Sequence, residues 1–256
     1  MTERSGSTRV APENVDRPGL SRRGWIAVLA AAGAAWCVAL LVWRQHGLDE
    51  TLVRQAAAHD PHGALVGLAQ VASQFGMAAI AAILLAGLVA SLSSESWRQQ
   101  RNVYLLTLMS LGISGLAGDV IKDLVDRPRP AVEFSELRLP AGGSTTDAVP
   151  SGHSTKAVAL ALPFLLFVTG WNGWRGAARL SVAGLALSVC ASRVALGAHY
   201  LSDVVGGLAM ALSGLPLAVW ASNAILRRMT PSDPNRAGKI GIAVYAVLMF
   251  ILWMLS

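Results

Sequence analysis

Charged residues are scarce in this chain. Asp, Glu, Lys and Arg make up 14% of its 256 residues, whereas hydrophobic residues make up 54%. Soluble globular domains carry roughly a quarter charged residues, so this composition argues against a soluble protein and indicates a membrane protein. There are only two cysteines, Cys37 and Cys190, far apart in apolar stretches. They suggest neither a metal-ligand pattern nor a disulfide framework, and we interpret them as small buried hydrophobic side chains.

The sequence also lacks internal repeats, low-complexity linkers between domains, and clusters of basic residues on one element. Its formal net charge is +6, but the basic residues are scattered between apolar runs, which argues against nucleic-acid binding. The positive excess suits anionic lipid surfaces or phosphate substrates, and it equally fits a signal for membrane orientation. Nothing in the sequence implies an obligatory protein partner.

Long apolar runs are abundant. The first extends over about 19 residues from Trp25 to Trp43, which is long enough to span a bilayer and longer than the core of a signal peptide. Similar runs follow at 75–92, 103–121, 154–170, 177–194, 202–222 and 240–255. We therefore predict an all-α membrane helical bundle, with a six-span domain in residues 25–222. A cytoplasmic loop and an additional C-terminal span are predicted in 223–256.

Two further segments lie outside these spans. Residues 1–24 are polar and rich in Arg, Pro, Gly and Ser, which predicts a disordered cytoplasmic tail. Residues 48–73 are amphipathic rather than uniformly apolar, which predicts an interfacial helix with a break at Asp60-Pro61.

The distribution of Lys and Arg predicts the orientation. With the N-terminus inside, 13 of the 21 basic residues fall on the cytoplasmic face, as the positive-inside rule requires. Nearly all the outside basic residues are concentrated in 122–138 and at Arg193. Positive charge on the outer side, against the general rule, indicates that these residues have a function there.

Three short segments carry polar residues at span ends. The first contains Lys122, Arg129 and Pro130, after the third span. The second is Pro150-Ser151-Gly152-His153, before the fourth span. The third joins the fifth and sixth spans and contains Ser192, Arg193, His199 and Asp203. In the predicted topology all three segments emerge on the outer face of the membrane.

These residue types suit a phosphate site. Arginine forks match phosphate oxygens in pairs, and the free N–H groups at a helix start bind anions where a glycine such as Gly152 lets the backbone come close. His199 and Asp203 are four residues apart and share a face if this stretch is helical. The carboxylate can then hold one ring nitrogen as N–H and leave the other free to attack phosphorus. His153 comes from another segment and could protonate the leaving oxygen.

The three segments resemble the signature motifs of the type 2 phosphatidic acid phosphatase and haloperoxidase superfamily, in its membrane-bound lipid phosphatase branch. Every defined position of Lys-x6-Arg-Pro, Pro-Ser-Gly-His and Ser-Arg-x5-His-x3-Asp is matched. The resemblance implies that His199 is the nucleophile, Asp203 its orienting carboxylate and His153 the acid and base. It further implies that phosphate is bound by Lys122, Arg129, Ser151, Gly152 and Arg193. No metal and no cofactor are expected, because the cationic side chains take the role that Mg²⁺ has elsewhere.

Arg127 and loop 131–149 lie next to the motif residues. Arg127 lies outside the motif positions, and we interpret it as a loop residue or a supporting residue near the site. Loop 131–149 is long enough to fold over the site as a lid, but a plain surface loop fits its sequence equally well.

The expected substrate is a membrane lipid phosphate. An outward-facing site in a bacterial cell membrane would favour undecaprenyl pyrophosphate, a choice that rests on the resemblance. Phosphatidic acid, phosphatidylglycerol phosphate and lipid A phosphates stay open, as does transfer of the phosphate to another lipid. Two other classes of function are a lipid-phosphate binding protein without catalysis and a vanadate-dependent oxidising enzyme. The apolar spans argue against the second, because vanadium haloperoxidases are soluble.

The orientation is tested by a reporter fused after residue 140, between the third and fourth predicted spans. We expect this reporter to be active outside the cytoplasm, and a matched fusion after residue 232 to be active inside. A cytoplasmic reporter at residue 140 would contradict an outward-facing site.

Overall fold

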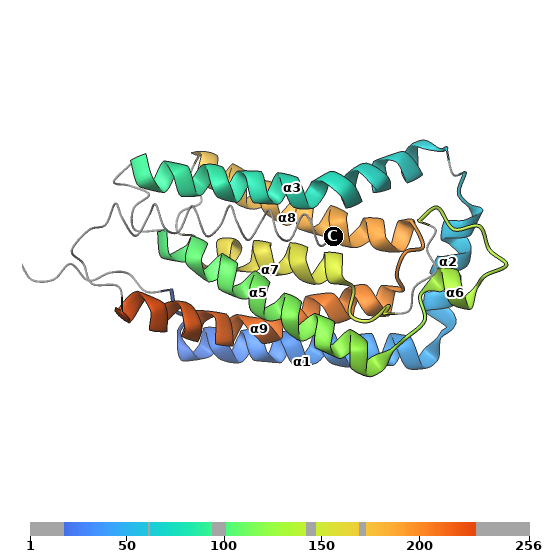
Figure 1. Ribbon diagram of the computed structural model, residues 1–256, viewed down its shortest axis with the longest axis horizontal. Coiled ribbons are helices and arrows are strands. Elements are labelled where there is room, and N and C mark those ends of the chain that lie inside the picture. The colour runs from blue at the N-terminus through green and yellow to red at the C-terminus, as the bar shows by residue number, and fades with distance from the viewer. Residues whose placement is uncertain (1–17, 61, 94–100, 142–146, 169–172, 229–256) are drawn as a thin grey trace, which may run out of the picture.

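The computed structural model describes residues 18–60, 62–93, 101–141, 147–168 and 173–228. Within these residues the chain is all-helical, as predicted. The long helices are α1 (Arg22–Gln45), α3 (Ala64–Ser93), α5 (Arg101–Val125), α7 (Gly152–Phe167), α8 (Gly173–Ala195) and α9 (Leu201–Arg228). Two shorter helices, α2 (Gly47–Ala58) and α6 (Pro130–Glu133), lie together at one end of the bundle (Figure 1).

The bundle is arranged around α7, which packs on α5, α8 and α9 and also contacts α3. Its apolar side chains, such as Leu160 and Phe164, are fully buried in a core shared with α3, α5 and α8. The guanidinium of Arg179 on α8 donates to the backbone oxygens of Val168 (2.8 Å) and Leu165 at the end of α7. These bonds satisfy carbonyl groups that a helix end leaves without an intrahelical partner.

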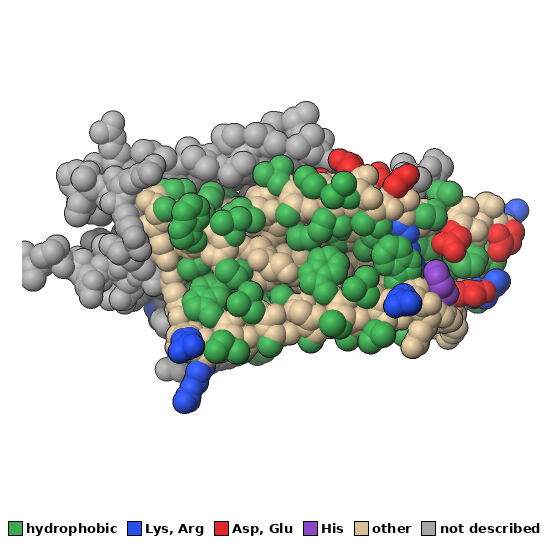
Figure 2. Space-filling model, turned by 90° about the horizontal axis from the view of Figure 1, so that it is seen from below, with side chains coloured by type: hydrophobic (Ala, Val, Ile, Leu, Met, Phe, Trp, Pro, Cys, Tyr) green, Lys and Arg blue, Asp and Glu red, His purple; other side chains and the backbone are tan. Residues whose placement is uncertain are grey.

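Among the described residues, five helical segments are long and apolar enough to cross a membrane. They lie in α1, α3, α8 and α9 and in residues Asn102–Glu133, which contain nearly all of α5 and all of α6. Large apolar side chains such as Leu116, Leu187 and Trp220 point outward from the bundle. Figure 2 shows hydrophobic side chains over the middle of one face and charged side chains toward the two ends. This pattern is the one expected where the solvent around the middle of the protein is lipid.

The predicted helical bundle is confirmed, with differences at individual spans. The run 154–170 corresponds to α7, which has only 16 residues and is buried by its neighbours rather than exposed along its length. The predicted break at Asp60 is present between α2 and α3. Residues 64–73, however, were wrongly assigned to an interfacial helix, since they form the first turns of the continuous α3. The predicted span 240–255 and residues 1–17 of the predicted tail lie outside the described residues.

The helix directions bring the three motif segments together. Helices α5 and α8 end, and α7 and α9 begin, at the end of the bundle that carries α2 and α6 (Figure 1). Helix α9 approaches the start of α7 closely at Gly207, where an added Cβ would lie 3.0 Å from the backbone oxygen of Ser151. A glycine at this position therefore sets the distance between two of the three segments.

Candidate active site

The second and third motif segments are joined by backbone contacts. The N–H of Ser151 donates to the backbone oxygen of Asp203 (2.9 Å). Ser151 precedes α7 as its N-cap, but its hydroxyl makes no capping bond and instead accepts from the hydroxyl of Ser154 (3.1 Å). The first N–H groups of α7 are thus not capped by this side chain, and a helix start of this kind attracts anions.

His199 lies in the short loop between α8 and α9 and is 2% exposed. Its Nδ1 is 2.8 Å from the backbone oxygen of Ala148 and 3.6 Å from a carboxylate oxygen of Asp203. Both neighbours are acceptors, so Nδ1 carries the proton and Nε2 keeps its lone pair. The predicted proximity of His199 and Asp203 is confirmed, but the nearer acceptor is the Ala148 carbonyl, which the sequence pattern did not indicate.

Asp203 is held from the other side by Arg127. One guanidinium nitrogen of Arg127 lies 2.6 Å from Asp203 Oδ1 and 2.7 Å from the hydroxyl of Ser202. A second nitrogen lies 3.1 Å from Asp49 Oδ2 on α2. The side chains of Arg127, Asp49 and Asp203 are 4%, 2% and 0% exposed, respectively. Arg127 is therefore a buried ion-pair partner of a predicted site residue.

Aromatic rings and α2 complete the surroundings of Arg127. Its guanidinium carbon lies 3.9 Å from the centre of the Tyr200 ring and 4.9 Å from that of Trp43, within cation–π range. The Asp49 carboxylate accepts from both the N–H (3.1 Å) and the hydroxyl of Ser202. Helix α2 is thereby attached to the first turn of α9, where Asp203 lies.

The described parts of loop 131–149 pack on the loop that carries His199. The Tyr200 hydroxyl donates to Glu133, and burial together with this carboxylate raises the pKa of the Tyr200 phenol. Ala141 N–H donates to the backbone oxygen of Leu196 (3.0 Å), and Ala148 N–H to that of Arg127 (3.0 Å). These contacts make the described parts a wall of the site. Residues 142–146 lie outside the described residues.

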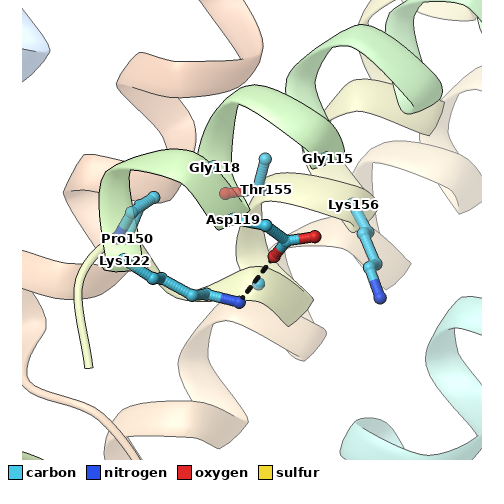
Figure 3. Close-up of a pocket in the computed structure, with 8 residues that line it drawn as sticks. Gly115, Gly118, Asp119, Lys122, Pro150, Thr155 and Lys156 are labelled. Carbon is cyan, nitrogen blue, oxygen red and sulfur yellow. Dashed lines mark hydrogen bonds and ion pairs between the residues drawn. The ribbon is translucent and has the colours of Figure 1, made fainter. Parts of the chain in front are cut away.

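Lys122 connects the first motif segment with the start of α7. Its Nζ is 3.0 Å from a carboxylate oxygen of Asp119, one turn earlier on α5 (Figure 3). The same Nζ would be 3.1 Å from a Cβ added to Gly152. The ammonium group therefore lies against the start of α7, and the two positive ends are next to each other.

The two predicted arginines differ from Lys122 in having unused donors. Among the described residues, Nε of Arg129 and Nε of Arg193 are both buried without a hydrogen-bond partner. Arg193 also donates through another nitrogen to the hydroxyl of Ser73 on α3, a contact that the sequence did not predict. Buried donors are normally satisfied, and a bound phosphate would supply the acceptors that these two lack.

His153 lies in the first turn of α7, half-buried. Burial lowers the pKa of its imidazole from 6.5 to about 3, with contributions from the charges of Arg193, His199, Lys156 and Arg129. Burial is also the main reason that the pKa of His199 is lowered, although the Asp203 carboxylate opposes the effect. Both imidazoles are consequently neutral near pH 7 while the site is empty of anions.

The arrangement suits nucleophilic attack on an anion. It combines a neutral imidazole with a free Nε2, a second imidazole, and cations from the first and third motif segments. Among the residues that the structure describes, no group of three or more His, Cys, Asp or Glu side chains could hold a metal ion.

The sequence predicted eight motif residues for this site but did not indicate the residues that hold several of them in place. Asp49, Ser73, Ala148 and Ser202 carry no motif and lie in segments interpreted as interfacial helix, loop or span. For Arg127 the sequence gave one indication, its position in the Arg127-Pro-Arg129-Pro stretch, between the defined motif residues Lys122 and Arg129.

Known proteins similar to this chain share the same region. Residues 103–227 match the family model described as the PAP2 superfamily, and this range contains all three motif segments. A lipid A 1-phosphatase of Rhizobium johnstonii is 31% identical over 125 residues, which cover 46% of this chain and 48% of that protein. A lipid A 1-phosphatase of Rhizobium etli is 30% identical over 135 residues, covering 50% and 54%. The chain spans about half the length of these curated relatives.

A solved structure supports the fold. The crystal structure of a transmembrane PAP2 type phosphatidylglycerolphosphate phosphatase from Bacillus subtilis superimposes with a TM-score of 0.54 at 20% sequence identity. The match covers 80% of this chain and 98% of that one. Motifs, matched region and fold agree: this chain is a multi-pass membrane protein of the PAP2 superfamily.

Proposed function

We propose that this protein is a lipid phosphate phosphatase that works through a phosphohistidine on His199. The observation that carries the proposal is the pairing of His199 Nδ1 with Ala148 and Asp203, which leaves Nε2 free beside arginines with unused donors. A nucleophile, an orienting partner and anion-binding groups are the parts that covalent catalysis at phosphorus requires.

In the first step Nε2 of His199 attacks phosphorus. An N–P bond forms while the P–O bond to the lipid breaks, and its electron pair stays on the leaving oxygen. His153 supplies the proton that this oxygen takes up. Lys122, Arg129 and Arg193, together with Ser151 and the start of α7, stabilise the negative charge on the other phosphate oxygens. Asp203 stabilises the positive charge that develops on the His199 ring.

In the second step water attacks the phosphohistidine. His153, now neutral, accepts a proton from the water as the new O–P bond forms. The N–P bond breaks, its electron pair returns to Nε2, and inorganic phosphate leaves. If a lipid hydroxyl replaced water in this step, the same intermediate would give a phosphotransferase.

Several lipid phosphates fit this chemistry. Undecaprenyl pyrophosphate, expected from the sequence, stays our first candidate. The relatives named lipid A 1-phosphatase support lipid A phosphate as a candidate, and the Bacillus subtilis structure is that of a phosphatidylglycerolphosphate phosphatase, a substrate that also stays open. We further propose that the site faces the outer side of the cell membrane, as the distribution of basic residues suggests.

The nucleophile is tested by His199→Ala. We expect phosphate release from a lipid phosphate by the detergent-purified protein in EDTA, and a loss of at least about 10³-fold in the variant. Alkaline quenching followed by mass spectrometry should find phosphate on the peptide that contains residue 199.

His62→Ala is the matched control, because His62 is exposed in the turn between α2 and α3. Its rate should equal that of the wild type. If His199→Ala kept its activity, histidine catalysis would be excluded; if the wild type released no phosphate from any lipid phosphate, a binding protein would be favoured.

The pH dependence follows from the two lowered pKa values. The pKa of His199 is lowered from 6.5, so this imidazole is neutral, and therefore nucleophilic, at pH 6.5 and above. His153 is unprotonated in the free site, so the proton for the leaving oxygen must arrive with a protonated phosphate, whose second pKa is about 6. Negative charge of the bound phosphate then raises the pKa of His153. We expect kcat/KM to be higher near pH 6.5 than near pH 8; a profile that rises steadily to pH 9 would contradict this order of proton transfer.

The role of the buried ion pairs is tested by Asp49→Asn. The amide keeps an oxygen for the Ser202 N–H but removes the charge that faces Arg127. Because Arg127 also holds Asp203, we expect kcat to fall about tenfold with little change in KM. Glu50→Gln is the matched control, since the neighbouring Glu50 is exposed and pairs with Arg54 instead. Equal kcat values in the two variants would show that α2 does not position Asp203.

A further inference from the structure

Lys156 carries a positive charge that has no role in the mechanism proposed above. It lies on α7, three residues after His153, and therefore on the same face of the helix one turn later. It belongs to none of the three motifs. Among the described residues no carboxylate forms a salt bridge with it. Partly burying a lysine ammonium that has no counter-ion of its own costs free energy unless an anion binds beside it.

Lys156 shares a small pocket with Lys122. The pocket lies between α5 and α7 and is lined by Gly115, Gly118, Asp119, Lys122, Gly152 and Lys156, among others. Figure 3 shows the two lysine side chains extending to the same side, with Asp119 between them. Asp119 is already paired with Lys122 at 3.0 Å. Two ammonium groups and one carboxylate leave one positive charge facing the pocket uncompensated.

Lys156 lies between His153 and the depth at which lipid tails would lie, which is where the leaving group of a lipid substrate would be. Helix α7 begins at the catalytic end and runs away from it (Figure 1). With a rise of about 1.5 Å per residue, Lys156 lies roughly 4.5 Å deeper than His153. Its charge is close enough to affect the His153 imidazole. The neighbouring α5 and α8 are candidate membrane spans, so deeper means nearer to where lipid tails would lie.

We propose that Lys156, together with Lys122, binds the second phosphate of a lipid diphosphate and makes diphosphate lipids the preferred substrates. The inference rests on the proposed function, in which His153 faces the leaving oxygen. His199 Nε2 would attack the terminal phosphorus, and the bridging P–O bond would break with its electron pair on the oxygen of the inner phosphate. The leaving group is then a lipid monophosphate, whose negative charge Lys156 stabilises. When the substrate is a lipid monophosphate, the leaving group is the lipid alcohol, which places no phosphate beside Lys156.

The test compares two substrates with the same tail, farnesyl diphosphate and farnesyl monophosphate. We expect the ratio of their kcat/KM values to fall roughly 10- to 100-fold in Lys156→Met, the range expected when a hydrogen bond between charged groups is lost. Methionine keeps the length and packing of the side chain. Lys156→Arg should retain the ratio, because it keeps the charge. Arg54→Met, at an exposed position of α2, is a matched control for loss of one positive charge and should also retain the ratio.

A binding measurement separates this inference from the proposed function. If the wild type hydrolyses neither substrate, the proposed function fails, and the subsite is judged by thermal shift with methylenediphosphonate and inorganic phosphate. The wild type should bind the diphosphonate more than about tenfold more tightly, and Lys156→Met should lose this preference. The inference is overturned if Lys156→Met keeps the substrate ratio, if it lowers both substrates equally, or if the wild type shows no preference for the diphosphonate.

Discussion

The buried ion pairs of Arg127 are the interaction on which the rest of the site depends. Asp203 is fully buried beside His199, and burying a carboxylate is costly unless a charged partner lies next to it. Arg127 is that partner, and it reaches Asp49 on α2 with its other nitrogen. One guanidinium therefore fixes the loop that carries His199, the start of α9 and a helix from a distant part of the sequence. Removing it would leave two buried carboxylates facing each other.

The opposite side of the site has an excess of positive charge. Cations from α5, α7 and α8, together with Arg129 directly before α6, gather around the start of α7, and only Asp119 pairs with one of them among the described residues. Charges of one sign repel in a partly buried place, so the arrangement is complete only with an anion present. Burial, and after it the repulsion between these charges, lowers the pKa of both imidazoles. In the proposed mechanism this keeps the His199 nucleophile neutral and makes proton delivery depend on the phosphate that binds.

The residues proposed for the site could be predicted because each lies at a fixed spacing from a recognisable neighbour. Each of these spacings lies within a single segment of the sequence: Lys122 to Arg129, Ser151 to His153, and His199 to Asp203. The residues that support them were not predictable in the same way. Asp49 and Ser202 are 153 positions apart, and His199 and Ala148 are 51 apart. A single sequence gives no signal for such pairs, since an aspartate on an amphipathic helix looks like any other surface charge.

The sequence by itself determined the helical class, the order of the apolar runs and their common polar end, because hydrophobic length and motif spacing are local properties. The tertiary structure decided which helix is central, where α3 begins, and that the short α7 is buried by its neighbours. It also decided that a backbone carbonyl contacts His199 and that Arg127 pairs with Asp203, and that Lys156 shares a pocket with Asp119 and Lys122. These features depend on how separate helices pack, and packing is fixed by contacts between residues far apart in the chain.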